Sequence, residues 1–163
     1  MKTVIIGGVA GGTKVAAKLK RENPQDEVVI YTKGKDISYA GCGLPYYIGG
    51  AIETEGELIV NTPEKFMGLT GTTVHTQSEV VAVDPAAKTV SVRRNRAEVV
   101  GAEVQQSGAG TDGTESPGQE TETVGYDKLI IAVGAESSVP PVEGTKLPGV
   151  FTVRTPQDAI GCR

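Results

Sequence analysis

The order of apolar and polar positions predicts alternating strands and helices in the first part of the chain. Lys2–Ile6 is a short apolar run that ends in glycines, as buried parallel strands do. A helical pattern follows from Gly11 to Arg21, Asn23-Pro24 ends it, and Glu27–Tyr31 is a second strand. Together these segments form a βαβ unit, the arrangement with which nucleotide-binding folds begin.

The rest of the chain predicts further elements of an α/β fold. We expect a short helix over Leu44–Ile48 and another that begins at Pro63, with Thr62 as its N-cap. Three alternating segments follow (TVHT, SEVVAVD and KTVSVRR), with a turn at Asp84-Pro85, and Tyr126–Val133 is another buried strand. We therefore predict one Rossmann-like domain over residues 1–163, with a parallel central sheet, flanking helices and a β-meander.

Composition narrows the class of protein. With 163 residues and 38% apolar content, the chain suits one domain with a buried core, and no apolar run approaches the roughly 20 residues of a spanning helix. An aromatic content of 4% and a net charge of −4 argue against a nucleic-acid partner. Two cysteines and no export signal indicate a cytoplasmic protein. No metal site and no membrane partner are expected.

Residues 101–123 differ from the rest of the chain. They contain five acidic residues, no Lys or Arg, and many Gly, Ser, Thr and Gln. Such a composition does not bury enough apolar surface to offset the entropy of ordering the chain. We interpret this segment as an acidic flexible loop or hairpin tip that interrupts the meander and has no catalytic role.

The segment IIGGVAGG joins the first strand to the first helix. Glycines there permit a tight turn and let the helix N-terminus approach a pyrophosphate, although a tight turn without a ligand is the alternative. Gly7 and Gly12 match the GxGxxG pattern, and Val9 stands at its central glycine. Thr32 and Lys33 stand where an acidic residue for the ribose hydroxyls is expected. Thr32 can still form one hydrogen bond, and Lys33 can reach a phosphate.

The run ISYAGCGLPYYIGG resembles the active-site segment of the single-cysteine branch of the pyridine nucleotide-disulfide oxidoreductases. That branch contains coenzyme A disulfide reductases, NADH oxidases, NADH peroxidases and polysulfide reductases. VIIGGVAGG, LIVNTPEKF, YDKLIIAVGA and PGVFTVRTPQDA resemble further family segments in the same order. The resemblance implies an FAD-dependent NAD(P)H:disulfide oxidoreductase that reduces coenzyme A disulfide, a polysulfide or a persulfide. The alternatives are an NADH oxidase that reduces oxygen and a non-catalytic flavin- or nucleotide-binding module.

Cys42 is the catalytic residue that the resemblance implies. A cysteine is a nucleophile only as the thiolate, which a helix N-terminus stabilises, and Cys42 stands just ahead of the expected short helix. Its neighbours Ala40, Gly41 and Gly43 leave room for a flavin ring and a second sulfur. In the family the matching cysteine cycles between thiolate and mixed disulfide or sulfenic acid. The alternative is a buried inert thiol. A disulfide with Cys162 is not expected.

Two features bear on the substrate. NADH oxidases and peroxidases of the family carry a histidine in the glycine loop, where this chain has Ala10, which favours a disulfide or persulfide substrate. Basic residues on one face of the first helix suit the phosphates of coenzyme A, or else form a solvated surface. Gly41 replaces the family's asparagine next to the cysteine. The substrate-binding residues implied are Lys14, Lys18, Arg21 and Ser38.

The resemblance also implies a set of FAD-binding residues. They are Gly7, Gly8, Val9, Ala10, Gly11, Gly12, Thr32, Lys33, Cys42, Val80, Ala132, Gly134 and Arg154. The family's NAD(P)H and dimerisation domains have no counterpart in these 163 residues, which contain no second glycine fingerprint. We therefore expect this portion to be inactive alone, and the full-length protein to be a homodimer.

Overall fold

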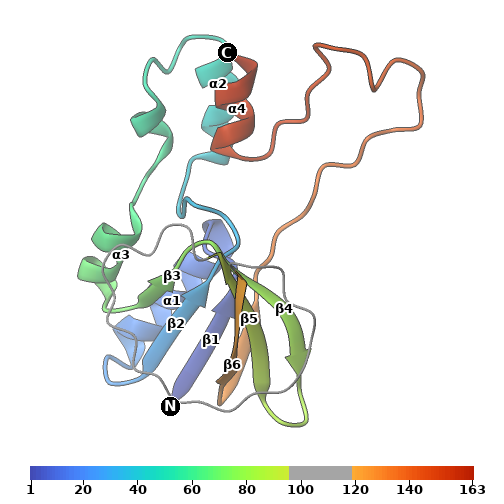
Figure 1. Cartoon of the computed structure of the whole chain (residues 1–163). Coiled ribbons are helices and arrows are strands. Elements are labelled where there is room, and N and C mark those ends of the chain that lie inside the picture. Colours follow the sequence, from blue (N-terminus) through green and yellow to red (C-terminus); the bar gives the residue numbers. More distant parts are fainter. Residues whose placement is uncertain (96–118) are drawn as a thin grey trace.

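A four-stranded parallel sheet forms the middle layer of the structure, a computed structural model that describes residues 1–95 and 119–163 (Figure 1). Its strand order is β3-β2-β1-β7. The strands are β1 (Lys2–Ile6), β2 (Glu27–Tyr31), β3 (Thr73–His75) and β7 (Lys128–Ile131). An antiparallel sheet covers one face of this layer and consists of β4 (Ser78–Asp84), β5 (Thr89–Asn95) and β6 (Gln119–Gly125).

Helices α1 (Ala10–Glu22) and α3 (Pro63–Thr70) cover the other face. Because side chains alternate along a strand, the two faces of the parallel sheet belong to two different cores. Ile5 and Ile30, which are paired across β1 and β2, pack against Ala16 and Phe66 of the helices. The opposite face packs against the antiparallel sheet through the cluster Val4, Val29, Tyr31, Val90, Val92 and Val124.

A third, smaller cluster lies beyond the ends of the parallel strands (Figure 1). It joins α2 (Leu44–Ile48) to α4 (Pro156–Cys162), with Leu44, Tyr47, Leu58 and Ala159 buried between them. Residues 132–155 connect β7 to α4 and contain no helix or strand. In Figure 1 this connection extends away from both sheets as a long arm.

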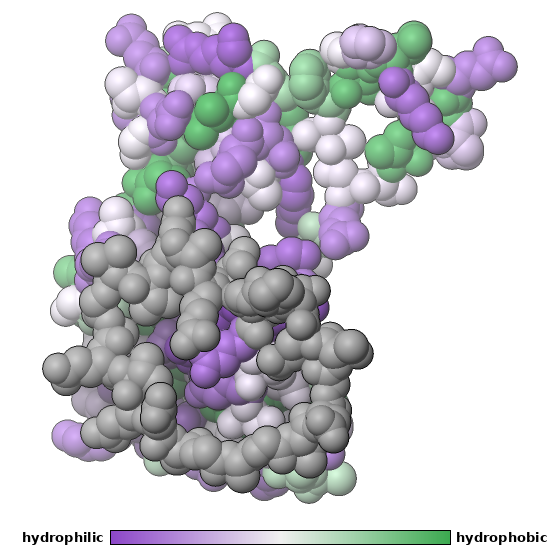
Figure 2. Space-filling view, in the orientation of Figure 1, coloured by the Kyte–Doolittle hydropathy of each residue, from purple (hydrophilic) through white to green (hydrophobic). Residues whose placement is uncertain are grey.

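The arm carries an unusual number of exposed apolar side chains. Val139, Val142, Leu147, Val150 and Phe151 are each more than half exposed. Figure 2 shows apolar residues of this arm on the surface at the upper right. Exposed apolar groups of this extent are typical of surfaces that other polypeptide covers.

The predicted fold class is confirmed, with differences in three elements. Thr73–His75, grouped with the alternating segments in the prediction, is instead the parallel edge strand next to β2. The strand expected over Tyr126–Val133 is shorter, because only Lys128–Ile131 pairs with β1. The last residues of the expected 101–123 loop belong to β6, since alternating Thr121, Thr123 and Glu122 pair along β5. Residues 101–118 lie outside the described residues.

Within the described ranges, no helix has the length and apolar character needed to cross a membrane. The same residues contain no group of three metal-ligating side chains.

Candidate nucleotide-binding cleft

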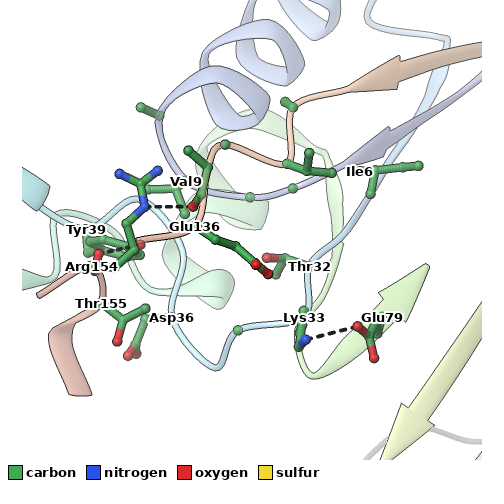
Figure 3. Close-up of a pocket in the computed structure, with 18 of the residues that line it drawn as sticks. Ile6, Val9, Thr32, Lys33, Asp36, Tyr39, Glu79, Glu136, Arg154 and Thr155 are labelled. Atoms are coloured by element: carbon green, nitrogen blue, oxygen red, sulfur yellow. Dashed lines mark hydrogen bonds and ion pairs between the residues drawn. The ribbon is translucent and has the colours of Figure 1, made fainter. Parts of the chain in front are cut away.

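A cleft of about 940 Å³ opens at the carboxyl ends of β1, β2 and β7 (Figure 3). Ligands of open α/β sheets bind at this edge, because the loops there are free to surround them. The glycine loop, the residues after β2, the first residues of β4, and the arm after β7 line the cleft. It is large enough for a dinucleotide.

The glycine loop forms one wall and has no room for side chains at two positions. Gly7 has a φ of +103°, and a Cβ built there would lie 2.2 Å from the carbonyl oxygen of Ala132. A Cβ on Gly12 would lie 1.8 Å from the carbonyl oxygen of Gly7. These contacts let α1 begin directly against the turn, with Ala10 and Gly11 on the cleft wall. The N-terminal N–H groups of a 13-residue helix therefore face the cleft, where they favour an anion.

The residues after β2 form the second wall. Thr32 is buried, and its backbone is held by the carbonyl of His75 and the N–H of Ser78. Lys33 is exposed and pairs with Glu79 on β4, with 3.1 Å between Nζ and Oε1. Val80, which the resemblance implies as an FAD-binding residue, is half-buried and lines the cleft beside Glu79, so it is not the fully buried core residue that its apolar strand position would suggest.

The turn after β7 forms the third wall. Gly134 has a φ of +73°, and the position of its missing Cβ is 3.1 Å from Nη2 of Arg154. Arg154 Nε donates to the carbonyl of Ala135 at 3.1 Å, and Tyr39 Oη donates to the carbonyl of Arg154 at 3.4 Å. Burial raises the pKa of Tyr39 above its ordinary value. Arg154 and Tyr39 therefore join the arm to the segment that leads to Cys42.

Cys42 lies beyond this end of the cleft and is not among the residues that line it. It is exposed, in a short 3-10 turn over Gly41–Gly43 just ahead of α2, so the structure does not bear out a buried inert thiol. Gly43 is buried, and a Cβ built there would lie 3.2 Å from Ile52 and 3.4 Å from Leu58, whereas no atom lies within 4 Å of a Cβ built on Gly41. Cys42 and Cys162 are both free thiols.

The predicted substrate residues lie outside the cleft as well. Lys14, Lys18 and Arg21 are exposed on one face of α1, where Lys18 pairs with Glu22 at 3.6 Å. Ser38 has a φ of +48°, and its Oγ accepts a hydrogen bond from Asn61 Nδ2 at 3.3 Å. The structure thus gathers every predicted FAD-binding residue except Gly12 and Cys42 at the cleft, and leaves the predicted substrate residues elsewhere.

The structure adds charged residues to the cleft that the sequence analysis missed. Asp36 Oδ2 accepts a hydrogen bond from Gln157 Nε2 at 2.6 Å, and Figure 3 shows it beside Thr155. Glu136 extends across the cleft toward Thr32 (Figure 3). Glu79 comes from β4, far along the chain from the glycine loop. The one feature of the sequence that could have indicated Glu79 as a cleft residue is its position directly before Val80.

Fold and cleft together define a Rossmann-like α/β domain with a candidate nucleotide-binding cleft. The family model of the pyridine nucleotide-disulphide oxidoreductases matches residues 1–163, and the chain belongs to this enzyme family. It is 34% identical over 158 residues to an NADH oxidase of Methanocaldococcus jannaschii, covering 97% of this chain and 30% of the relative. It is 33% identical to an NAD(P)H coenzyme A polysulfide/persulfide reductase of Pyrococcus horikoshii, covering 99% of this chain and 31% of the relative.

The solved structure of reduced Bacillus anthracis CoADR-RHD is similar throughout the chain. Its TM-score is 0.78 at 33% identity, and the match covers 99% of this chain and 25% of that protein. The chain therefore spans less than a third of the length of each of these relatives.

Proposed function

We propose that this chain is the FAD-binding portion of an NAD(P)H:disulfide oxidoreductase whose redox-active residue is Cys42. The proposed substrate is a small-molecule disulfide, polysulfide or persulfide, such as coenzyme A disulfide. The longer protein would take electrons from NAD(P)H and act as a cytoplasmic homodimer.

The observation that supports this proposal best is the close approach of the glycine loop to the start of α1. Gly7 and Gly12 pack directly against backbone carbonyls, with no room for a side chain, and this close packing brings the α1 N-terminus to the cleft wall. Backbone N–H groups there would hold the pyrophosphate. Ala132 and Gly134 on the β7 side would face the middle of the cofactor, and Arg154 would lie toward its flavin end.

Cys42 would act on the substrate just outside the cleft. Its thiolate would attack one sulfur of the substrate disulfide, so that a bond forms between Sγ and that sulfur while the other sulfur leaves as a thiolate. FAD, when bound and reduced by NAD(P)H, would supply the two electrons that break this mixed disulfide, which releases the second substrate sulfur as a thiolate and returns Cys42 to the thiolate. Exposure of Cys42 gives a bulky substrate access to Sγ.

Ala10 supports the choice of a sulfur substrate over oxygen. It begins α1 and lines the cleft with an inert methyl group, so the loop offers no proton donor for oxygen or peroxide chemistry. Reduction of oxygen is the second candidate, which the similarity to the Methanocaldococcus jannaschii NADH oxidase favours. A non-catalytic nucleotide-binding module is a third candidate and would not require Cys42.

Flavin titration and turnover test the proposal separately. The 163-residue chain is expected to bind FAD, seen as a change in flavin fluorescence, and to consume no NAD(P)H. A protein that continues through the relatives' length is expected to reduce coenzyme A disulfide or polysulfide, and Cys42→Ser to abolish this turnover. Turnover with oxygen alone would favour the oxidase, and unchanged turnover in Cys42→Ser would refute the role of Cys42.

A further inference from the structure

The end of β2 lacks the acidic side chain that usually holds the adenosine ribose. Thr32 occupies that position and is only 7% exposed. Its Cβ lies 3.3 Å from the place of a Cβ on Gly8, so the side chain is packed against the glycine loop. One hydroxyl in this position does not replace a carboxylate, which accepts two hydrogen bonds from a ribose.

A carboxylate lies at the same end of the cleft but comes from another strand. Glu79 is the second residue of β4 and lines the cleft next to Lys33, the residue that follows Thr32 (Figure 3). Its Oε1 lies 3.1 Å from Lys33 Nζ, and its Oε2 lies 2.6 Å from Arg93 Nη2. Arg93 stands directly opposite Glu79 in the β4–β5 ladder.

These two cations give Glu79 the properties of a ribose acceptor. Hydrogen bonds from Arg93 and Lys33 hold the pKa of Glu79 below its ordinary value, so the side chain is an anion at neutral pH. Contacts on two sides also restrict its rotamers before a ligand binds. Each carboxylate oxygen has more than one acceptor direction, so both retain capacity for a hydroxyl donor.

We propose that Glu79 accepts the hydrogen bonds of the adenosine ribose hydroxyls, in place of the acidic residue that Thr32 replaces. The assignment rests on the proposed function, because it requires an adenine dinucleotide in the cleft. With the pyrophosphate at the α1 N-terminus, the ribose lies toward the end of β2, where Glu79 stands.

Two other carboxylates line the cleft and are the competitors for this role. Asp36 is engaged by Gln157 and lies beside Thr155, toward the arm. Glu136 reaches toward Thr32 from the segment after β7. Glu79 is favoured because two basic side chains from different elements orient it at the β2 end.

Titration calorimetry of the 163-residue chain with ADP, 2′-deoxy-ADP and 3′-deoxy-ADP tests the assignment. The wild-type chain is expected to bind ADP about tenfold or more tightly than at least one deoxy analogue, since a hydrogen bond to a charged group is lost. Glu79→Gln is expected to reduce this ratio to about threefold or less, because a neutral amide oxygen is a weaker acceptor. Lys33→Gln, which leaves the β4–β5 pair intact, is expected to reduce it partially.

Glu27→Gln is the matched control. Glu27 also pairs with a lysine at 3.1 Å, but on the first residue of β2, at the opposite end of the sheet. Its variant is expected to retain the wild-type ratio. An unchanged ratio in both Glu79→Gln and Lys33→Gln, or a loss confined to Glu136→Gln, overturns the assignment to Glu79 and leaves FAD binding intact. Failure of the wild-type chain to bind FAD and ADP overturns the proposed function together with the assignment.

Discussion

Replacement of Gly12 by alanine is expected to destabilise the chain through a contact between two backbone segments. The added Cβ would lie 1.8 Å from the carbonyl oxygen of Gly7, whereas real Cβ contacts are essentially never under 3.0 Å. The turn and α1 must therefore separate by about 1 Å. Neither neighbour is a flexible side chain, so the cost lies at the upper end of the range for overpacking, about 3 kcal/mol.

An opposing effect reduces this cost and defines the control. Alanine in a helix is more favourable than glycine by about 1 kcal/mol, so the net destabilisation by Gly12→Ala is about 2 kcal/mol. Gly11 lies next to it in α1, and its added Cβ would lie 3.7 Å from the Ala132 side chain, an ordinary contact. Gly11→Ala therefore retains the helical gain without the clash.

Thermal unfolding followed by far-UV circular dichroism distinguishes the two variants. For a chain of this length, 2 kcal/mol corresponds to a decrease in Tm of about 4–8 °C. Gly11→Ala is expected to melt at or slightly above the wild-type temperature. If Gly12→Ala melts no lower than Gly11→Ala, the close approach between the turn and α1 does not exist, and the fit of the loop to a pyrophosphate loses its basis.

Three further predictions concern α4 and the cysteine turn. Thr155→Ala removes the hydroxyl that accepts the Asp158 N–H at the start of α4 and is expected to cost about 1 kcal/mol in urea unfolding. Backbone N–H groups of Thr155 and Arg154 lower the pKa of Asp158 in the folded chain. The ionised carboxylate therefore stabilises the fold at pH values above the ordinary pKa of an aspartate, and this stabilisation is lost as the pH falls through the lowered pKa. Asp158→Asn should therefore weaken the acid dependence of urea unfolding; an unchanged dependence contradicts this. Gly41→Asn is expected to leave Tm unchanged, because no atom lies within 4 Å of the added Cβ. It is also expected to lower KM for coenzyme A disulfide in the longer protein, because it restores the asparagine that the family has next to the cysteine.

The elements that local patterns define could be predicted from the sequence. The βαβ unit depends on short-range apolar spacing, and β1 and β2 have the predicted bounds. The N-cap of α3 was also predicted, since Thr62 Oγ1 accepts the N–H of Lys65. Such features depend on residues within one turn or one strand, so neighbouring positions contain the information.

Features that depend on long-range pairing were not predicted. The segment Thr73–His75 has an alternating pattern that suits either sheet, and only its contact with β2 places it in the parallel one. Glu79 likewise is held at the cleft by ion pairs with Lys33 and Arg93, which lie 46 and 14 positions from it along the chain. The spacing of neighbouring residues does not predict such contacts between distant parts of the chain.

The separation of Cys42 from the cleft has a structural cause. Residues 38–40 pair with residues 58–60, since the Ala40 N–H donates to the Leu58 carbonyl and the Val60 N–H to the Ser38 carbonyl. α4 packs against α2 through Tyr47 and Ala159, and Arg163, directly after α4, donates to the Ile52 and Glu53 carbonyls.

Cys42 is therefore held by the small α2–α4 cluster, whereas the glycine loop is held by the two large cores of the parallel sheet. Three connections join these parts, namely residues 32–41, residues 59–62 and the arm of residues 132–155, and the hydrogen bond from Tyr39 to the Arg154 carbonyl links the first to the last. A cofactor that serves both parts must extend from the glycine loop past Tyr39. The FAD of the proposed function would lie with its flavin on the Tyr39 side. Such a cofactor would connect the cleft to a thiol that does not line it.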